Sequence, residues 1–337
     1  MKKNTDHITI KDVAMYSNVS PATVSLVINN RSGVSHGTKN KVLNAIKKLN
    51  YKPNQTARNL VMQCPSAIGL IVTNIENPFY GELVHYVQDE IDKTKYSLLL
   101  GISNDDVKKE KKAIKDMIAR DAGGIIIVPA RNGENDLSHI YSLRELNIPF
   151  VFITSKYHGI MSDCVMSNLE EGMYKATIHL LKRDKRKIYF ITDNRKLKLS
   201  GDRVNGYIRA YKDCHIKYND EHIIETNPTV GNGIIITNEI LKKSKPDAII
   251  TANALLSLGV MKCIKDKGLN VPNDISVICF DELSYSSLLY TPITTVEQPL
   301  REICKEAVSI LLKRIEGEKK PYQTIYLPTK LIVRSSS

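Results

Sequence analysis

Residues 9–30 read TIKDVAMYSNVSPATVSLVINN, and this stretch decides the fold of the N-terminal region. Apolar residues at helical spacing predict two short helices, at 10–16 and 21–29. Ser20 is placed to cap the second helix. Pro21 occupies the first turn of that helix, where the missing N–H group costs nothing. Two helices joined by so tight a turn predict a helix-turn-helix pair.

The outer face of the second helix carries small polar side chains, whereas Val24, Val27 and Ile28 form its apolar stripe. A third helix is expected at about 38–49, which gives the module a thin three-helix core. A helix-turn-helix lays its second helix in the major groove of DNA. The residues expected to meet base edges and phosphates are Ser20, Ala22, Thr23, Ser25, Leu26 and Asn29.

Positive charge is concentrated in the same region. The whole chain of 337 residues has a formal net charge of +12. Residues 1–66 contain ten Lys and Arg against two Asp, a balance of +8 that leaves +4 for the other 271 residues. This asymmetry indicates a polyanionic partner for the N-terminal region. A basic surface without any partner is the alternative.

From residue 67 onward, short β-rich runs alternate with amphipathic helical patterns, which predicts parallel sheets covered by helices on both faces. Eight such runs in about 270 residues suit two doubly wound lobes better than one large sheet. Ligands of such folds bind beyond the carboxyl ends of the strands, so a cleft is expected between the lobes. The expected strands lie at 67–73, 96–102, 123–129, 149–154, 187–192, 222–226, 247–251 and 275–280.

Several functional classes are disfavoured by the sequence. The opening segment lacks the apolar stretch of a signal peptide, and no apolar run approaches the roughly 20 residues that cross a bilayer. The six cysteines are scattered without metal-ligand spacing, so we expect a reduced cytoplasmic setting, no metal and no cofactor. GxSxG, HExxH, Walker-type and GxGxxG motifs do not occur, so an enzyme is the weaker interpretation.

Residues 9–30, followed by VSHGTKNKVLNAIKKLNYKPNQTARNL at 34–60, closely resemble the DNA-binding headpiece of the lactose-repressor (LacI/GalR) family of bacterial transcriptional regulators. The resemblance continues at lower density to the C-terminus. The segments that look like landmarks of the family's effector domain, in the same order, are IENPFYGEL from 75, GDRVNGYIRAY from 201, GLNVPNDISVICFDE from 268 and TPITTVEQP from 291.

The resemblance implies a small all-α helix-turn-helix headpiece at 1–52, a hinge helix and linker at 53–66, and an effector-binding and dimerisation core at 67–337. The core would consist of two α/β doubly wound lobes, like those of a periplasmic binding protein. The family's members are homodimers, and two-fold symmetry predicts a palindromic operator in double-stranded DNA.

The resemblance also implies three crossings of the chain between the lobes, expected near 162–167, 291–295 and 322–327. The expected lobes are therefore an N-lobe at about 67–163 plus 295–323 and a C-lobe at about 167–291 plus 327–337.

The segment at 51–60 places Asn54, Ala57 and Leu60 at helical spacing, but a helix this short is marginal alone in water. In the resembling family two hinge helices pair in the minor groove, and the residue matching Leu60 wedges into the central base step. Packing of Leu60 against the core is the alternative. The resemblance implies that an effector controls whether the hinge helices pair.

Leu26 lies about 200° round its helix from the core residue Val24, so it faces away from the apolar stripe. The resembling family often has Arg here, which donates two hydrogen bonds to guanine. Leucine cannot, so a departure from a guanine-containing operator is expected at this point. The alternative is that Leu26 packs against Tyr51 or a neighbouring residue and contacts no base. The remaining residues expected at DNA are Thr9, Thr38 and Tyr51.

Five residues match ligand positions of the family and are expected to bind a small effector, a sugar, sugar phosphate or related metabolite: Phe79, Tyr80, Arg203, Asn253 and Asp281. Each also has a structural interpretation, such as a core aromatic ring or a turn former. Where some members have carboxylates, this chain has Thr154, Ser167-Asn168 and Asn253-Ala254, so an ordinary pyranose is in doubt.

Two other functions stay open. A solute-binding protein of a transport system would explain residues 67–337 but would have no use for the basic N-terminal region. A regulator could also respond to a partner protein in place of a small ligand. The sequence does not distinguish a repressor from an activator, although repression is the expected role.

Overall fold

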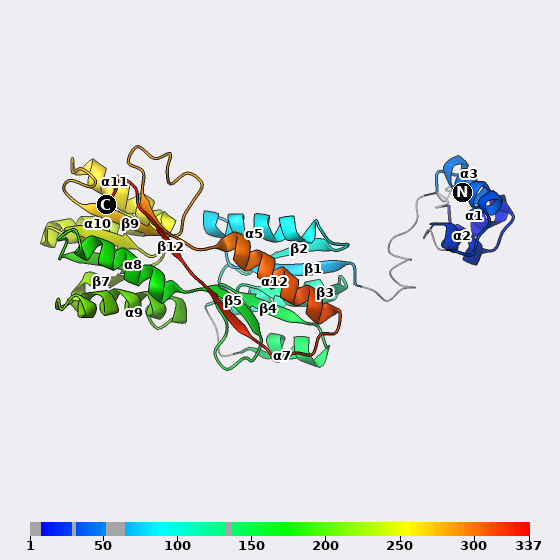
Figure 1. Ribbon diagram of the computed structural model, residues 1–337, viewed down its shortest axis with the longest axis horizontal. Helices are drawn as coiled ribbons and strands as arrows, with labels where there is room; N and C mark the ends of the chain where they lie inside the picture. The colour runs from blue at the N-terminus through cyan, green and yellow to red at the C-terminus, as the bar shows by residue number, and fades with distance from the viewer. Residues whose placement is uncertain (1–7, 29–31, 52–64, 132–135) are drawn as a thin grey trace, which may run out of the picture. The chain divides into compact units, whose positions relative to one another are not determined.

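The computed structural model describes residues 8–28, 32–51, 65–131 and 136–337, drawn in colour in Figure 1. The chain divides into two compact units, Met1–Pro65 and Ser66–Ser337. Each unit is described by itself below.

The first unit contains the three predicted helices, α1 (Ile10–Ser17), α2 (Pro21–Ile28) and α3 (His36–Lys48). The third helix begins two residues before the expected position because the Ser35 side chain accepts a hydrogen bond from the backbone N–H of Thr38. The buried residues that join the helices are small and apolar: Val13, Ala14, Val24, Val27, Val42 and Ala45.

The turn between α1 and α2 depends on Asn18, whose φ of 52° lies in the left-handed region. Asparagine tolerates this region better than other non-glycine residues. The backbone N–H of Val19 donates to the carbonyl of Ala14 at 3.0 Å, which closes the end of α1. Ser20 then caps α2 by accepting from the N–H of Thr23 at 3.1 Å, as the sequence predicts.

The second unit contains two lobes, each built on a six-stranded sheet. In the first lobe the strand order is β11-β5-β4-β3-β1-β2, and all neighbours are parallel. Its strands are β1 (Ala67–Val72), β2 (Ser97–Ile102), β3 (Ala122–Ile127), β4 (Phe150–Ile153), β5 (Asp163–Ser167) and β11 (Thr324–Leu327). Its helices are α5 (Pro78–Ile91), α6 (Val107–Ile118), α7 (Ser138–Glu145) and α12 (Leu300–Ile315).

In the second lobe the order is β12-β10-β9-β8-β6-β7, and only β12 runs antiparallel to its neighbour. Its strands are β6 (Ile188–Thr192), β7 (Ile223–Glu225), β8 (Ala248–Thr251), β9 (Ser276–Phe280), β10 (Thr294–Glu297) and β12 (Lys330–Ile332). Its helices are α8 (Leu169–Leu181), α9 (Lys198–Asp213), α10 (Val230–Lys243) and α11 (Ala254–Asp266), with a short 3-10 turn η1 (Asp220–His222).

Helices cover both faces of both sheets, which is the predicted doubly wound arrangement. In the first lobe α5 and α12 lie together over one face, as Figure 1 shows, while α6 and α7 pack on the other. In the second lobe α8 and α9 share one face and α10 and α11 the other. A Cβ atom at Gly206 would lie 2.1 Å from the carbonyl oxygen of Glu170, so only glycine lets α9 pack this closely on α8.

The chain crosses between the lobes three times, directly after β5, β10 and β11. The expected crossings at 162–167, 291–295 and 322–327 come slightly too early, because β5, β10 and β11 continue to Ser167, Glu297 and Leu327. The assignment of residues 295–297 to the N-lobe was wrong, since β10 pairs with β9 and β12 of the second sheet. The red strands in Figure 1 trace the last crossing.

Among the described residues, no helix is both long enough and apolar enough to pass through a membrane.

Candidate functional site

Helix α2 presents a polar outer face. Ser20 and Ala22 are exposed, and Thr23, Ser25 and Leu26 are half-buried, whereas Val24 and Val27 are fully buried. Leu26 is not part of the apolar cluster that the described residues of the three helices form. Tyr51 does pack against that cluster and is partly buried inside the unit. The outer face of α2 is therefore available for a partner.

The N-terminal ends of α1 and α3 hold two further residues that are predicted to contact DNA. The Thr9 hydroxyl and backbone N–H both donate to the Asp12 carboxylate at 2.7 Å, and these bonds lower the pKa of Asp12. Thr38 forms a 2.9 Å hydroxyl contact with Ser35. Helix starts concentrate backbone N–H donors, which suit phosphate groups. The predicted residues Asn29, Asn54, Ala57 and Leu60, and with them the hinge helix, lie outside the described residues.

The described part of the first unit is strongly basic. Its lysines Lys11, Lys41, Lys47 and Lys48 are exposed, and Asp12 is its single acidic residue. Lysines spread over a small module in this way create a positive potential that attracts a polyanion.

The second unit brings together all five residues expected at an effector. Phe79, Tyr80, Arg203, Asn253 and Asp281 line one cavity of about 70 Å³ between the lobes. They come from the start of α5, from α9, and from the carboxyl ends of β8 and β9. Thr154, which the sequence places where some family members have a carboxylate, lines the cavity too. The sequence pattern did not identify four other polar residues that line it: Asn77, Arg131, Asp193 and Gln298.

The aromatic pair forms one wall of this cavity. The Phe79 and Tyr80 rings meet edge to face, with centroids 5.2 Å apart. The Asn77 side chain caps α5 by accepting from the N–H of Phe79 at 3.2 Å, which fixes the start of the helix. Loss of hydration raises the pKa of the Tyr80 hydroxyl. The pair therefore offers an apolar face and one neutral hydroxyl.

Arg203 and Asp281 form the charged part of the cavity and are 8% and 5% exposed. The Arg203 guanidinium lies over the Phe280 ring, 4.4 Å from its centroid, and its Nε has no hydrogen-bond partner among the described residues. Burial raises the pKa of Asp281 to about 6, against the opposing effects of Arg203 and of the 2.6 Å hydrogen bond from Gln298. The unpartnered Nε leaves a donor for a ligand.

The backbone at the cavity is strained at two places. Asp281 has φ of 77° and Thr154 has φ of 65°, in the left-handed region that a β-branched residue rarely adopts. Such strain costs of order 1–3 kcal/mol and is concentrated at ligand sites. Asn253 is committed in part, because its side-chain oxygen accepts from the N–H of Leu256 at 2.9 Å to cap α11. Its NH₂ group is left for a ligand.

Arg131 joins the two lobes across the cleft. Its Nε donates to Asp105 of the first lobe at 2.7 Å, and its Nη1 donates to Asp193 of the second lobe at 2.5 Å. Burial lowers the pKa of Arg131, but its hydrogen bond to Asp105 and the charges of Asp105 and Asp193 outweigh this effect and raise the pKa above its ordinary value. Ser200 also donates to Asp193. Arg131 is therefore a cationic bridge that holds the lobes together at the ligand cavity.

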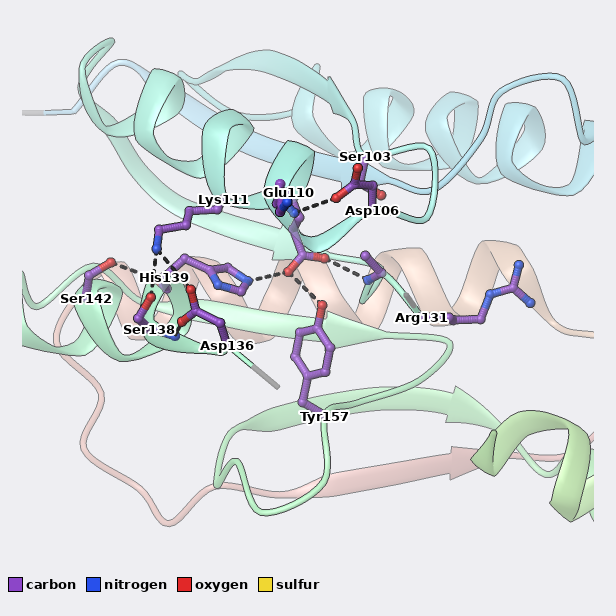
Figure 2. Close-up of polar contacts among 12 residues, drawn as sticks. Ser103, Asp106, Glu110, Lys111, Arg131, Asp136, Ser138, His139, Ser142 and Tyr157 are labelled. Carbon is purple, nitrogen blue, oxygen red and sulfur yellow. Dashed lines mark hydrogen bonds and ion pairs between the residues drawn. The ribbon is translucent and has the colours of Figure 1, made fainter. Parts of the chain in front are cut away.

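A buried polar network centred on Glu110 lies beside Arg131, as Figure 2 shows. Glu110 is fully buried, and its Oε2 accepts from the backbone N–H of Ala130 at 2.8 Å. Its Oε1 accepts from the Tyr157 hydroxyl at 2.8 Å and lies 2.7 Å from His139 Nε2. The network holds the backbone of Ala130, which precedes Arg131, so it fixes the position of the Arg131 backbone from which the bridging side chain extends.

Within the residues that the structure describes, no group of three His, Cys, Asp or Glu side chains is arranged to hold a metal ion.

Comparison with known proteins agrees with this architecture. The model of "Bacterial regulatory proteins, lacI family" matches residues 9–54, and that of the "Periplasmic binding protein-like domain" matches residues 177–337. The HTH-type transcriptional repressor PurR of Aliivibrio fischeri is 32% identical over 97% of this chain and 98% of its own length. Catabolite control protein A of Priestia megaterium is 30% identical over 98% of this chain and 99% of its own length.

Among solved structures, the lac repressor dimer bound to operator and the anti-inducer ONPF superposes with a TM-score of 0.87. It is 25% identical and covers 98% of this chain and 99% of its own. The helix-turn-helix unit, the two doubly wound lobes and full-length relatives together place the chain: it belongs to the lacI family of bacterial regulatory proteins and is a DNA-binding regulator of transcription.

Proposed function

We propose that this chain is a repressor that binds a palindromic or near-palindromic operator as a homodimer, and that a small polar metabolite bound between the lobes controls it. The observation that carries the effector half is the meeting of Phe79, Tyr80, Arg203, Asn253 and Asp281 around one cavity. The exposed polar face of α2 on a basic three-helix unit supports the DNA half. The role is regulatory and not catalytic, and its place is the cytoplasm, where the DNA is.

In this proposal residues 1–52 form the headpiece, residues 53–66 the hinge helix and linker, and residues 67–337 the core that binds effector and dimerises. Helix α2 enters the major groove, where Ser20, Ala22, Thr23, Ser25 and Leu26 approach bases and phosphates. Leu26 offers a methyl-rich side chain in place of a bidentate donor, so it accommodates a thymine methyl and does not select guanine.

Control of DNA binding follows from the bridge at Arg131. A ligand in the cleft changes how tightly the two lobes are held, because Arg131 touches both lobes and lines the cavity. A ligand shifts such an equilibrium only through its different affinities for the two lobe arrangements. The hinge helices respond to that change, which strengthens or weakens operator binding.

Binding-site selection from random duplex DNA tests the proposal. The full-length protein is expected to enrich a palindrome, and size-exclusion chromatography with light scattering is expected to give a dimer. Enrichment of no sequence over competitor DNA at moderate ionic strength contradicts the proposal.

A protein without residues 1–62 distinguishes the two other candidates. A regulator loses its DNA affinity in this variant and keeps ligand binding, whereas a solute-binding protein loses nothing. Control by a partner protein predicts instead that no small metabolite changes operator affinity while a cell extract does.

A further inference from the structure

The cleft holds a second and much wider cavity, of about 1020 Å³. Arg131 and Leu199 line both cavities, so the two cavities are neighbours. Its walls are the loop at 155–162 after β4, the loop at 196–199 before α9, and the segment that leads into β11.

The lining of the wide cavity is cationic. It contains Arg131, Lys156, Lys196 and Lys198, and none of the described residues that line it is Asp or Glu. The Lys156 ammonium donates to the neutral Thr324 hydroxyl at 3.0 Å, and Lys196 has no carboxylate within ion-pair distance among the described residues. Lys198 is partly neutralised by Asp202 at 2.7 Å. A cavity with one sign of charge and low-dielectric walls concentrates counter-ions.

Two further features of the lining favour an anion. Helix α9 has 16 residues and begins at Lys198, and no side chain caps its start at Leu197. The positive end of its dipole and its first N–H groups therefore remain available. Ser162 is 5% exposed and lines the same cavity, and its hydroxyl has no hydrogen-bond partner among the described residues. A buried hydroxyl without a partner is costly unless a ligand uses it.

The rest of the wall fits the uncharged part of a metabolite. Tyr157 lines the cavity and is held rigid by its hydrogen bond to buried Glu110, as Figure 2 shows. Tyr322 lines it as well, and its half-exposed ring lies against the guanidinium of Arg314, 5.0 Å from the ring centroid. Aromatic faces suit the C–H surface of a sugar or the face of a base.

We propose that the wide cavity binds the phosphate group of a phosphorylated metabolite, among Arg131, Lys156, Lys196 and Lys198. The proposal rests on the proposed function, since it names the chemical class of the effector. The hydroxyl-bearing end of the metabolite then points past Arg131 toward Arg203 and Asp281. The phosphate competes with Asp105 and Asp193 for Arg131, so its binding acts directly on the bridge between the lobes.

Thermal unfolding of the full-length protein with inorganic phosphate, at constant ionic strength against chloride, tests the proposal. Phosphate is expected to raise the midpoint of the core transition in a saturable way. The double variant K196Q/K198Q removes two charge-assisted contacts, so its apparent affinity for phosphate is expected to fall at least about tenfold.

Two matched controls remove equal charge elsewhere. The variant K242Q/K243Q changes exposed lysines at the end of α10, and K47Q/K48Q changes exposed lysines of α3 in the basic first unit. Both are expected to keep the response of the core transition to phosphate. Unsaturable stabilisation, or equal phosphate affinity in K196Q/K198Q and the controls, overturns the proposal. Failure of the proposed function is seen separately, as the absence of an enriched operator in binding-site selection with the same preparations.

Discussion

Replacement of Glu110 by alanine is expected to destabilise the core strongly. Glu110 is fully buried and accepts hydrogen bonds from Ala130 and Tyr157 at 2.8 Å, with His139 Nε2 at 2.7 Å. All three partners are buried, at 0%, 3% and 3% exposure for Ala130, Tyr157 and His139. Water therefore cannot replace the carboxylate for them.

The magnitude follows from what the substitution leaves behind. Each buried donor without a partner costs about 1–3 kcal/mol, and loss of a buried charged partner costs about 3–5 kcal/mol in total. We therefore expect E110A to lower the free energy of unfolding by about 3–5 kcal/mol. The variant Y157F removes one donor and keeps the carboxylate, so a loss of about 1–2 kcal/mol is expected.

Urea unfolding followed by far-ultraviolet circular dichroism measures both effects on the full-length protein. The matched control is E145A, because Glu145 is an exposed glutamate at the end of α7 and its loss is expected to stay within about 0.5 kcal/mol. A loss for E110A no larger than that for E145A refutes the argument that the network holds the segment before Arg131.

Three further outcomes follow from the site. The variant R131M removes the ion pairs that join the lobes, so it is expected to give a larger radius of gyration in small-angle X-ray scattering. The control R195M, whose two acidic partners both lie in the second lobe, is expected to leave the radius of gyration unchanged. The pKa of Asp281 is raised from 3.8 to about 6, so between these values the native state keeps a proton that the unfolded chain loses. The free energy of unfolding therefore falls as the pH rises from about 4 to about 6. This fall amounts to about 3 kcal/mol. The variant D281N keeps the acceptor for Gln298 and is expected to show a smaller fall. Equal pH profiles of stability in the two proteins contradict the assignment of the pH dependence to Asp281. In binding-site selection, L26R is expected to prefer guanine at one position by roughly tenfold or more, and an unchanged preferred base there disproves the predicted role of Leu26.

The fold was largely predictable because central parallel strands are buried on both faces and read as unbroken apolar runs. β1, AIGLIV, is buried at all six positions and was found directly. The unpredicted strand β5, DCVMS, is also buried throughout, but it begins with a fully buried charge. Asp163 is tolerated there because Arg314 donates to it at 2.8 and 3.1 Å. That partner lies 151 residues further along the chain, so no local pattern revealed the strand.

The site residues that the sequence predicts differ in a physical way from those that it does not predict. Arg203 and Asp281 lie in segments that look like family landmarks, so the sequence nominated them, and the structure places both at one cavity. Arg131 was missed because its role depends on Asp105 and Asp193, which follow β2 and β6 in different lobes. Ion pairs between segments that lie far apart in the chain leave no periodic pattern in its sequence. The departure at Leu26 was visible only against the family resemblance.

The small cavity, of about 70 Å³, and the bridge between the lobes share the side chain of Arg131. We predict that a metabolite the size of a hexose displaces Arg131 from Asp193 as it enters, because Arg131 lines the cavity and is held across the cleft. Arrival of the effector is therefore gated by the protein, and its association rate should level off at high concentration at the frequency with which this gate opens. Departure is limited by the same gate, so a regulator built in this way holds its signal for longer than its affinity alone would suggest.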